Sequence, residues 1–188
     1  MALPAPVEAG YTGERYFGLV ADGVLRPDDR VELLDGVIVA MPPQDPAHAF
    51  AVMRLDRVLQ DLIGTRASIR VQLPFIAGTH SVPEPDIAVV PGPESRYAGA
   101  HPSAALLIVE VADSSLIQDR LTKAPIYAGS GVPEYWLVNL RDGCVEVFRS
   151  PQPEARRYVE KHIARRGERV ELAALAGVSL AVDDLLPS

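Results

Sequence analysis

The sequence contains a single cysteine and a single tryptophan, and it has no long hydrophobic run. Cys144 cannot form a disulfide within the chain, which excludes a disulfide-stapled secreted fold and leads us to expect a cytoplasmic protein. No apolar stretch approaches the ~20 residues that a transmembrane helix needs, and the N-terminus lacks the segments of a secretory signal, so we expect no membrane association. We therefore expect one domain over residues 1–188, with a flexible tail over 1–10.

Positive charge is also scarce. The chain has 18 Lys and Arg residues against 25 Asp and Glu, a formal net charge of −7. Proteins that grip duplex nucleic acid usually present a basic surface, so this balance argues against tight DNA binding through electrostatics alone. The balance does not exclude a nucleic-acid ligand, because carboxylates gathered at a metal site stop repelling the ligand once the metal is bound.

Hydrophobic periodicity and turn residues divide the chain into alternating helices and strands. The expected elements, in chain order, are a short helix (12–21, with Tyr16, Phe17 and Val20 as its apolar side), a β-hairpin (31–41), a helix opened by Asp45-Pro46 and ended by Gly64, strands (68–76, 86–90 and 106–111), a helix between 113–115 and 129–131, and strands (134–140, 144–149, 157–163 and 170–172). This order predicts an α/β fold with a mixed sheet, whose core is helix-strand-strand-strand-helix-strand with extra strands at both ends.

A single carboxylate interrupts the most apolar of these strands. Leu106-Leu107-Ile108-Val109 is typical of a buried strand, and Glu110 follows it directly. A buried charge is costly unless it is paired or bound to a metal, so Glu110 predicts a functional site. Asp86 opens a second short buried strand, and the two carboxylates converge if these strands are neighbours in register. Such oxygens suit Mg²⁺, with Mn²⁺ as a substitute.

The helix that follows Glu110 carries Asp119, Lys123 and Tyr127, which are spaced four apart and share one face. Helical side chains lean toward the helix N-terminus, so Lys123 points back toward the end of the helix where Glu110 lies. An amine there can orient a water molecule or neutralise charge on a phosphoryl group. A plainer interpretation stays open, in which Asp119 and Lys123 form an ordinary exposed helix ion pair.

Plainer interpretations exist for the other candidates as well. Asp86 follows a proline and can be a turn or strand-cap residue, and His48 lies in register with an apolar stripe, which is typical of a packed histidine. Glu32 can be the solvent-facing side chain of an alternating strand, and Gln72 an ordinary polar residue.

These motifs, taken together, resemble a known family. They are, in order, VELLDGVIVAMPP (31–43), a histidine near the start of the next helix, PEPDIAVV (83–90), LLIVEVADSS (106–115), the Asp119, Lys123 and Tyr127 face, and GVPEYWLVNL (131–140). The chain resembles the Uma-two-type family of "putative restriction endonucleases", found mostly in bacteria, which belongs to the PD-(D/E)XK nuclease superfamily.

The resemblance implies roles for particular residues. Asp86 matches the first metal-binding acid, and Glu110 matches the acid of the E-x-K element. The lysine of that element is expected two residues after Glu110, where this chain has Ala112, and Lys123 on the helix matches it instead. Glu32 matches an early acid that completes the metal site.

Weaker matches and the implied activity follow from the same resemblance. His48 and Gln72 match accessory positions, as do Asp119 and Tyr127. The family implies a Mg²⁺-dependent endonuclease that hydrolyses DNA phosphodiester bonds through a metal-activated water, and by analogy a homodimer. The missing lysine and the net charge favour an alternative, a catalytically inactive module that keeps the nuclease fold for binding.

Overall fold

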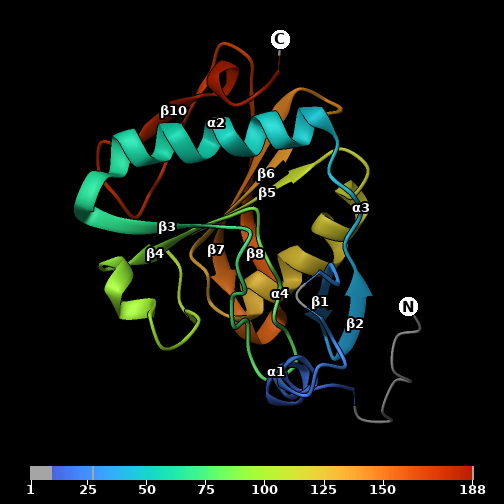
Figure 1. Ribbon diagram of the computed structural model, residues 1–188. Coiled ribbons are helices and arrows are strands. Elements are labelled where there is room, and N and C mark those ends of the chain that lie inside the picture. Colours follow the sequence, from blue (N-terminus) through green and yellow to red (C-terminus); the bar gives the residue numbers. More distant parts are fainter. Residues whose placement is uncertain (1–9, 27, 188) are drawn as a thin grey trace.

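The computed structural model describes residues 10–26 and 28–187 (Figure 1). The tail expected over residues 1–10 lies, apart from Gly10, outside the described residues. The helices are α1 (Gly13–Ala21), α2 (Pro46–Ile63), α3 (Leu116–Gln118) and α4 (Ala124–Gly129), with the π-helical turn η3 (Asp119–Lys123) and the short 3₁₀ turns η1 (Gly64–Arg66), η2 (Glu94–Tyr97), η4 (Pro153–Ala155) and η5 (Val182–Asp184). The strands are β1 (Val31–Leu34), β2 (Val37–Ala40), β3 (Ala67–Val71), β4 (Ile87–Pro91), β5 (Leu107–Ala112), β6 (Glu134–Asn139), β7 (Cys144–Gln152), β8 (Arg157–Arg165), β9 (Arg169–Glu171) and β10 (Ser179–Ala181).

Six strands form the central sheet, in the order β3-β4-β5-β6-β7-β8. Only β5 and β6 pair in parallel among these neighbours, and the other pairs are antiparallel, so the sheet is mixed as the sequence predicted. The parallel pair requires a crossover, which α3, η3 and α4 supply. The hairpin β1–β2 and the pair β9–β10 form two small separate sheets.

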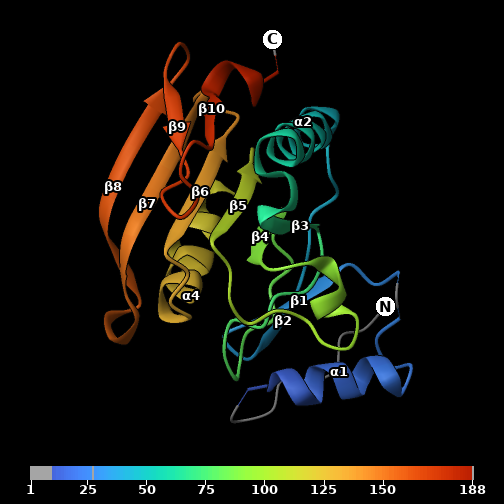
Figure 2. The same ribbon diagram turned by 90° about the vertical axis from the view of Figure 1, so that its left-hand side faces the viewer.

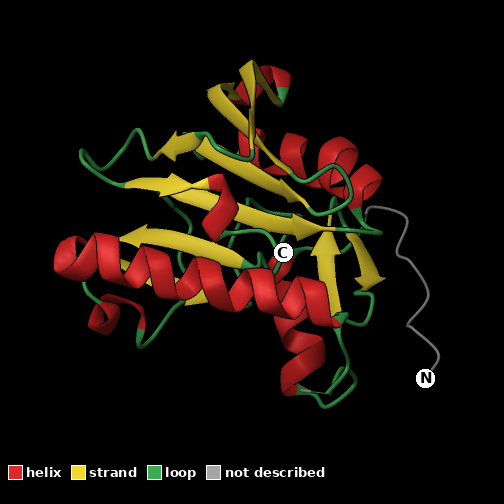
Figure 3. Ribbon diagram, turned by 90° about the horizontal axis from the view of Figure 1, so that it is seen from above, coloured by secondary structure: helices red, strands yellow, loops and turns green. Residues whose placement is uncertain are grey.

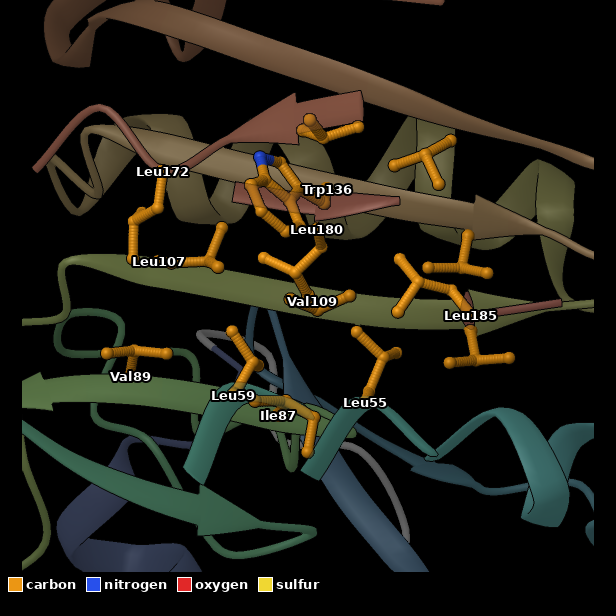
Figure 4. Packing of buried hydrophobic residues seen from close by; sticks show 14 of the residues in the cluster. Leu55, Leu59, Ile87, Val89, Leu107, Val109, Trp136, Leu172, Leu180 and Leu185 are labelled. Atoms are coloured by element: carbon orange, nitrogen blue, oxygen red, sulfur yellow. The ribbon is translucent and has the colours of Figure 1, made fainter. Parts of the chain in front are cut away.

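Both faces of the central sheet are covered (Figures 1 and 2). Helix α2 runs roughly along the strands on one face, where the C-terminal segment with β9 and β10 lies beside it (Figure 3). On this face Val109 and Ile87 of the sheet pack against Leu55 and Leu59 of α2, and Trp136 lies beside Leu172 and Leu180 of the C-terminal segment (Figure 4). Helix α4 covers the opposite face, where Tyr127 packs against a second group of buried sheet residues. The faces alternate along each strand, so Glu110 lies on the α4 side.

Local sequence rules explain the elements that were predicted correctly. The Asp45 side chain accepts a hydrogen bond from the backbone N–H of His48 at 2.9 Å and thereby caps α2 at its first turn. Gly64 ends that helix with a positive φ of 57°. The hairpin turns at Asp35 and Gly36, whose φ angles of 47° and 81° match the turn expected for Asp-Gly.

Three predictions about the elements were wrong. The strand expected over 68–76 ends at Val71, because Gln72 adopts a left-handed backbone with φ 51° and turns the chain. Val20 is exposed, and Leu19 takes its expected place on the buried side of α1. The helix expected after β5 is not continuous, because a π-helical turn over Asp119–Lys123 separates α3 from α4.

Candidate active site

The candidate site lies at one end of β4 and β5. In the antiparallel register Ile87 pairs with Val109, and one further step along each strand places Asp86 next to Glu110 on the same side of the sheet. Both residues line one cavity, together with ten other charged or amide side chains: Asp29, Arg30, Glu32, Gln44, His48, Gln72, Glu84, Gln118, Asp119 and Lys123. The structure thus brings together all the predicted site residues, with Tyr127 directly behind Glu110.

Glu110 is buried and is held through one of its oxygens. Its Oε1 accepts hydrogen bonds from the Tyr127 hydroxyl at 2.6 Å and from the Lys123 ammonium at 3.1 Å. In the part of the chain that the structure describes, Oε2 accepts none, although Glu110 lines the cavity. Burial raises the pKa of Glu110 well above its usual range against the pull of Lys123, and the neighbouring acids raise it further.

Lys123 lies among three carboxylates. Its Nζ is 3.1 Å from Glu110 Oε1, 3.2 Å from Glu32 Oε1 and 4.0 Å from Asp119 Oδ1. Burial alone disfavours the charged amine, but these carboxylates outweigh it and raise the pKa of Lys123, so the amine stays protonated. The interpretation of Asp119 and Lys123 as an exposed helix pair is therefore wrong, since the two residues are 2% and 7% exposed.

Glu32 reaches the site from a separate sheet. The hairpin β1–β2 contacts the rest of the fold through a bridge between Leu33 and Val82, and all four residues of β1 are buried. Glu32 is 2% exposed and its Oε2 accepts a hydrogen bond from the backbone N–H of Glu84 at 3.2 Å. The solvent-facing interpretation of Glu32 is therefore wrong, because both sides of this short strand are covered.

Asp86 is fixed by three donors from three elements. Its Oδ1 accepts a hydrogen bond from the Gln72 amide at 3.0 Å, and its Oδ2 accepts one from the Val111 backbone N–H at 2.8 Å and interacts with His48 Nε2 at 3.1 Å. Burial opposes ionisation, but these contacts prevail and lower the pKa of Asp86. His48 and Gln72 are thus neither a merely packed histidine nor an ordinary surface residue: both hold Asp86 in place.

The π-helical turn shapes the third side of the site. Such turns are rare and often occur at functional sites. Here the turn begins at Asp119, whose Oδ2 accepts a hydrogen bond from the Ser115 hydroxyl at 2.6 Å. Burial raises the pKa of Asp119 to about 6 against the opposing charge of Lys123. Pro125 is the local signal for this turn, because it has no N–H to bond the carbonyl of Leu121 within the turn and its ring crowds that carbonyl.

Two residues that the sequence analysis missed support the site. Glu84 lines the cavity, and burial together with the charge of Glu32 raises its pKa. Its position two residues before Asp86, in Pro-Glu-Pro-Asp, was the available signal. Glu146 on β7 is buried and accepts hydrogen bonds from Arg120, the residue after Asp119, at 3.1 Å, which ties the π-helical turn to the sheet. An alternating strand gives no signal for such a contact.

The residues fit a hard divalent cation in charge and donor type. Within residues 10–26 and 28–187, no three His, Cys, Asp or Glu side chains already stand as a complete set of metal ligands. The cavity is nevertheless lined by six acids, Asp29, Glu32, Glu84, Asp86, Glu110 and Asp119, against two cations, Arg30 and Lys123. Such a surplus of carboxylate oxygens is the donor chemistry that Mg²⁺ and Mn²⁺ prefer.

The chain is similar to known proteins both in sequence and in fold. The sequence matches the model of the Uma2 family, described as "Putative restriction endonuclease", over residues 15–183. The fold is similar to the crystal structure of a putative nuclease belonging to DUF820 from Anabaena variabilis, with a TM-score of 0.74 and 20% identity, over 93% of this chain and 97% of that one. No curated protein matches the sequence.

Among the described helices, none has the length and apolar character needed to cross a membrane.

Proposed function

This chain belongs to the Uma2 family, and from that premise we propose that it is a divalent-metal-dependent endonuclease that hydrolyses DNA phosphodiester bonds. One observation carries the proposal: Lys123 contacts Glu110 and Glu32 in a cavity that Asp86 also lines. A protonated amine beside buried acids is the combination that phosphoryl transfer needs, because the reaction develops negative charge on phosphate oxygens.

Asp86, Glu110 and Glu32 are the residues that would hold Mg²⁺, with Mn²⁺ as a substitute. When bound, the ion supplies an acidified water and offsets charge on the phosphoryl group. The contacts support this assignment in two ways. The two donors to Glu110 both use Oε1, which leaves Oε2 for a cation. The three contacts to Asp86 lower its pKa, so it is ionised over the whole range of physiological pH.

The remaining residues act on position and charge. Lys123 stays protonated, so it donates hydrogen bonds to a phosphate oxygen and does not serve as a general base. Tyr127 orients Glu110, while His48 and Gln72 orient Asp86. The E-x-K element of the superfamily has its lysine at the position of Ala112, which is fully buried in β5. Lys123 on the helix takes the place of that lysine.

The direct test is cleavage of plasmid and oligonucleotide DNA by the purified protein with Mg²⁺ or Mn²⁺. We expect cleavage by the wild type and by the control Glu154→Gln, which changes an exposed acid on η4 that does not line the cavity. We expect none by the double variant Glu110→Ala, Lys123→Ala. Equal cleavage by the wild type and the double variant would assign the activity to a contaminant and end the nuclease proposal.

A second candidate is a catalytically inactive module that uses the nuclease fold for binding. Two observations favour it. The described residues contain no complete set of metal ligands, and Lys123 already forms ion pairs with Glu32 and Glu110, two of the acids that would hold the metal. Calorimetry separates the two. Tight Mn²⁺ binding raises the melting temperature by mass action, by the equivalent of about 2.7 kcal/mol at a hundred times Kd. The enzyme predicts this gain for the wild type and its loss in Asp86→Asn, whereas the inactive module predicts no gain in either.

We also propose that the enzyme acts as a homodimer in the cytoplasm, since two related sites cut two antiparallel strands most simply. Sedimentation equilibrium measures the mass directly. A monomer at working concentrations, with undiminished cleavage of both strands, would contradict the dimer.

A further inference from the structure

Arg70 is a half-buried cation outside the candidate active site. It lies on β3 opposite Ala88 of β4, on the same side of the sheet as Asp86. Its Nη2 donates a hydrogen bond to His101 Nδ1 at 3.1 Å, and its guanidinium carbon lies 5.9 Å from the centre of the Tyr97 ring. Its Nε is buried and donates to no partner in the described chain.

The environment of Arg70 does not balance its charge. Burial lowers the pKa of Arg70, and among the described residues no carboxylate lies within ion-pair distance of it. A guanidinium presents parallel N–H donors as a fork, which matches the two oxygens of a carboxylate or a phosphate. His101 offers one acceptor nitrogen, so it occupies half of this fork and leaves Nε unfilled. Leaving a buried donor unpaired costs free energy, which an anion would recover.

The surroundings of this fork favour an anion. A surface hollow beside it is lined by Arg96, Tyr97 and His101, and no acid is among its described lining residues. The Tyr97 hydroxyl donates to the Pro91 carbonyl at 2.6 Å, which fixes the ring beside Arg70. His101 is exposed, and apart from the bond to Arg70 it is held by a stacked contact with Phe17 at 5.5 Å. It can therefore swing out and let a larger acceptor reach Nε.

We propose that Arg70, with Arg96 and His101 beside it, forms an anion site that takes a phosphate of the nucleic-acid backbone. This proposal rests on the proposed nuclease function. Arg70 lies two residues before Gln72, and Gln72 holds Asp86. A contact at Arg70 would therefore fix the register of the substrate strand beside the acids, in a protein whose net charge of −7 otherwise repels it.

The test compares Arg70→Gln with Arg57→Gln, a matched control that removes an exposed arginine from α2 on the other face of the sheet. Binding of a labelled DNA duplex is followed by fluorescence anisotropy in EDTA at several salt concentrations. We expect Arg70→Gln to weaken binding about tenfold and to reduce the salt slope by about one, as the loss of one phosphate contact does. In cleavage assays KM should rise about tenfold while kcat stays unchanged.

A second measurement uses inorganic phosphate and does not depend on nuclease activity. The Arg70 Nε–H resonance in a ¹H–¹⁵N spectrum should shift as phosphate is added, together with the backbone amides of Tyr97 and His101 beside it. Those two amides should not shift in Arg70→Lys, which keeps the charge and loses the fork. A shift with unchanged DNA binding in Arg70→Gln would assign the site to a free phosphate and overturn the backbone contact. No shift and no binding defect would mean that water satisfies Nε, and both claims fail. If the wild type does not cleave DNA but the Arg70 Nε–H resonance still shifts with phosphate, the nuclease proposal fails and the anion site stands.

Discussion

Replacing Lys123 with methionine removes the ammonium group that contacts Glu32 and Glu110 and keeps the apolar length of the side chain. The change leaves buried carboxylates without their cation, and breaking a buried pair in this way typically costs about 3–5 kcal/mol. For a chain of this size, 1 kcal/mol corresponds to roughly 2–4 °C. We therefore expect the melting temperature of Lys123→Met to fall by about 10 °C at pH 8.

The pH dependence identifies the cause. The pKa of Glu110 is already raised by burial, so between its unfolded and folded values the native protein binds more protons than the unfolded chain. Stability then falls as the pH rises through this window. Without the ammonium the pKa of Glu110 rises further, so the defect of Lys123→Met should be large at pH 8 and should shrink toward pH 5 as the acids take up protons.

Thermal melts from pH 5 to pH 8 provide the measurement, and the double variant Lys123→Met, Glu110→Gln provides the control. Removing the stranded charge as well should recover more than half of the loss at pH 8, which a double-mutant cycle quantifies. If the single variant loses the same stability at every pH, or if the double variant is no better, the loss comes from packing. The electrostatic account of the cluster would then be wrong.

Two further predictions concern the supports of the site. Tyr127→Phe removes a hydrogen bond to the buried Glu110 carboxyl, so it should cost about 1.5–3 kcal/mol in urea melts and lower kcat without changing KM. The control is Tyr158→Phe, which should leave kcat unchanged because the Tyr158 hydroxyl donates to the Val132 carbonyl away from the cavity. Equal kcat values for the two variants would refute the positioning role of Tyr127. Glu146 is buried, but the hydrogen bonds that it accepts from cations outweigh burial and lower its pKa. The ionised Glu146 carboxylate therefore stabilises the fold at pH values above its unfolded pKa, and this contribution is lost as the pH falls through the lower folded pKa. Its cations are Arg120 and Lys161, whose side chains are 35% and 44% exposed, so solvent partly screens both ion pairs. We expect Glu146→Gln to lose about 1–2 kcal/mol at pH 7 and little relative to wild type near pH 3, and a difference that persists at acid pH would contradict this.

Most of the fold follows from short-range rules. The cap at Asp45, the stop at Gly64 and the Asp35-Gly36 turn are each decided by a few neighbouring residues, and the structure confirms all three. The strand prediction over 68–76 failed because alternation continues past Val71 in the sequence, while the backbone of Gln72 turns to meet residues that lie far along the chain: its N–H donates to the carbonyls of Pro85 and Asp86.

The candidate site likewise combines residues that local sequence identifies with contacts that only the tertiary structure forms. Glu110 could be recognised from the sequence alone, because a carboxylate in an apolar strand needs a partner wherever that strand lies. Strand order and helix geometry pointed to Asp86 and Lys123 as its partners, while the role of Glu32 came only from the family resemblance. The distances among these groups could not be predicted. Spacing made Asp119 and Lys123 fit a solvent-exposed pair equally well, and only the packing of η3 against the sheet, tied by Arg120 to Glu146, buries them.

What the amino-acid sequence determined by itself was therefore the set of helices and strands and the presence of a charge that burial makes costly. Both depend on interactions within a few residues. The tertiary structure alone decided which acids meet at the site, because Glu32 comes from a separate hairpin and Asp86 directly precedes β4, 24 residues before Glu110 in the chain. Strand register and the docking of β1 against Val82 set these distances, and both arise from long-range pairing that no local pattern encodes.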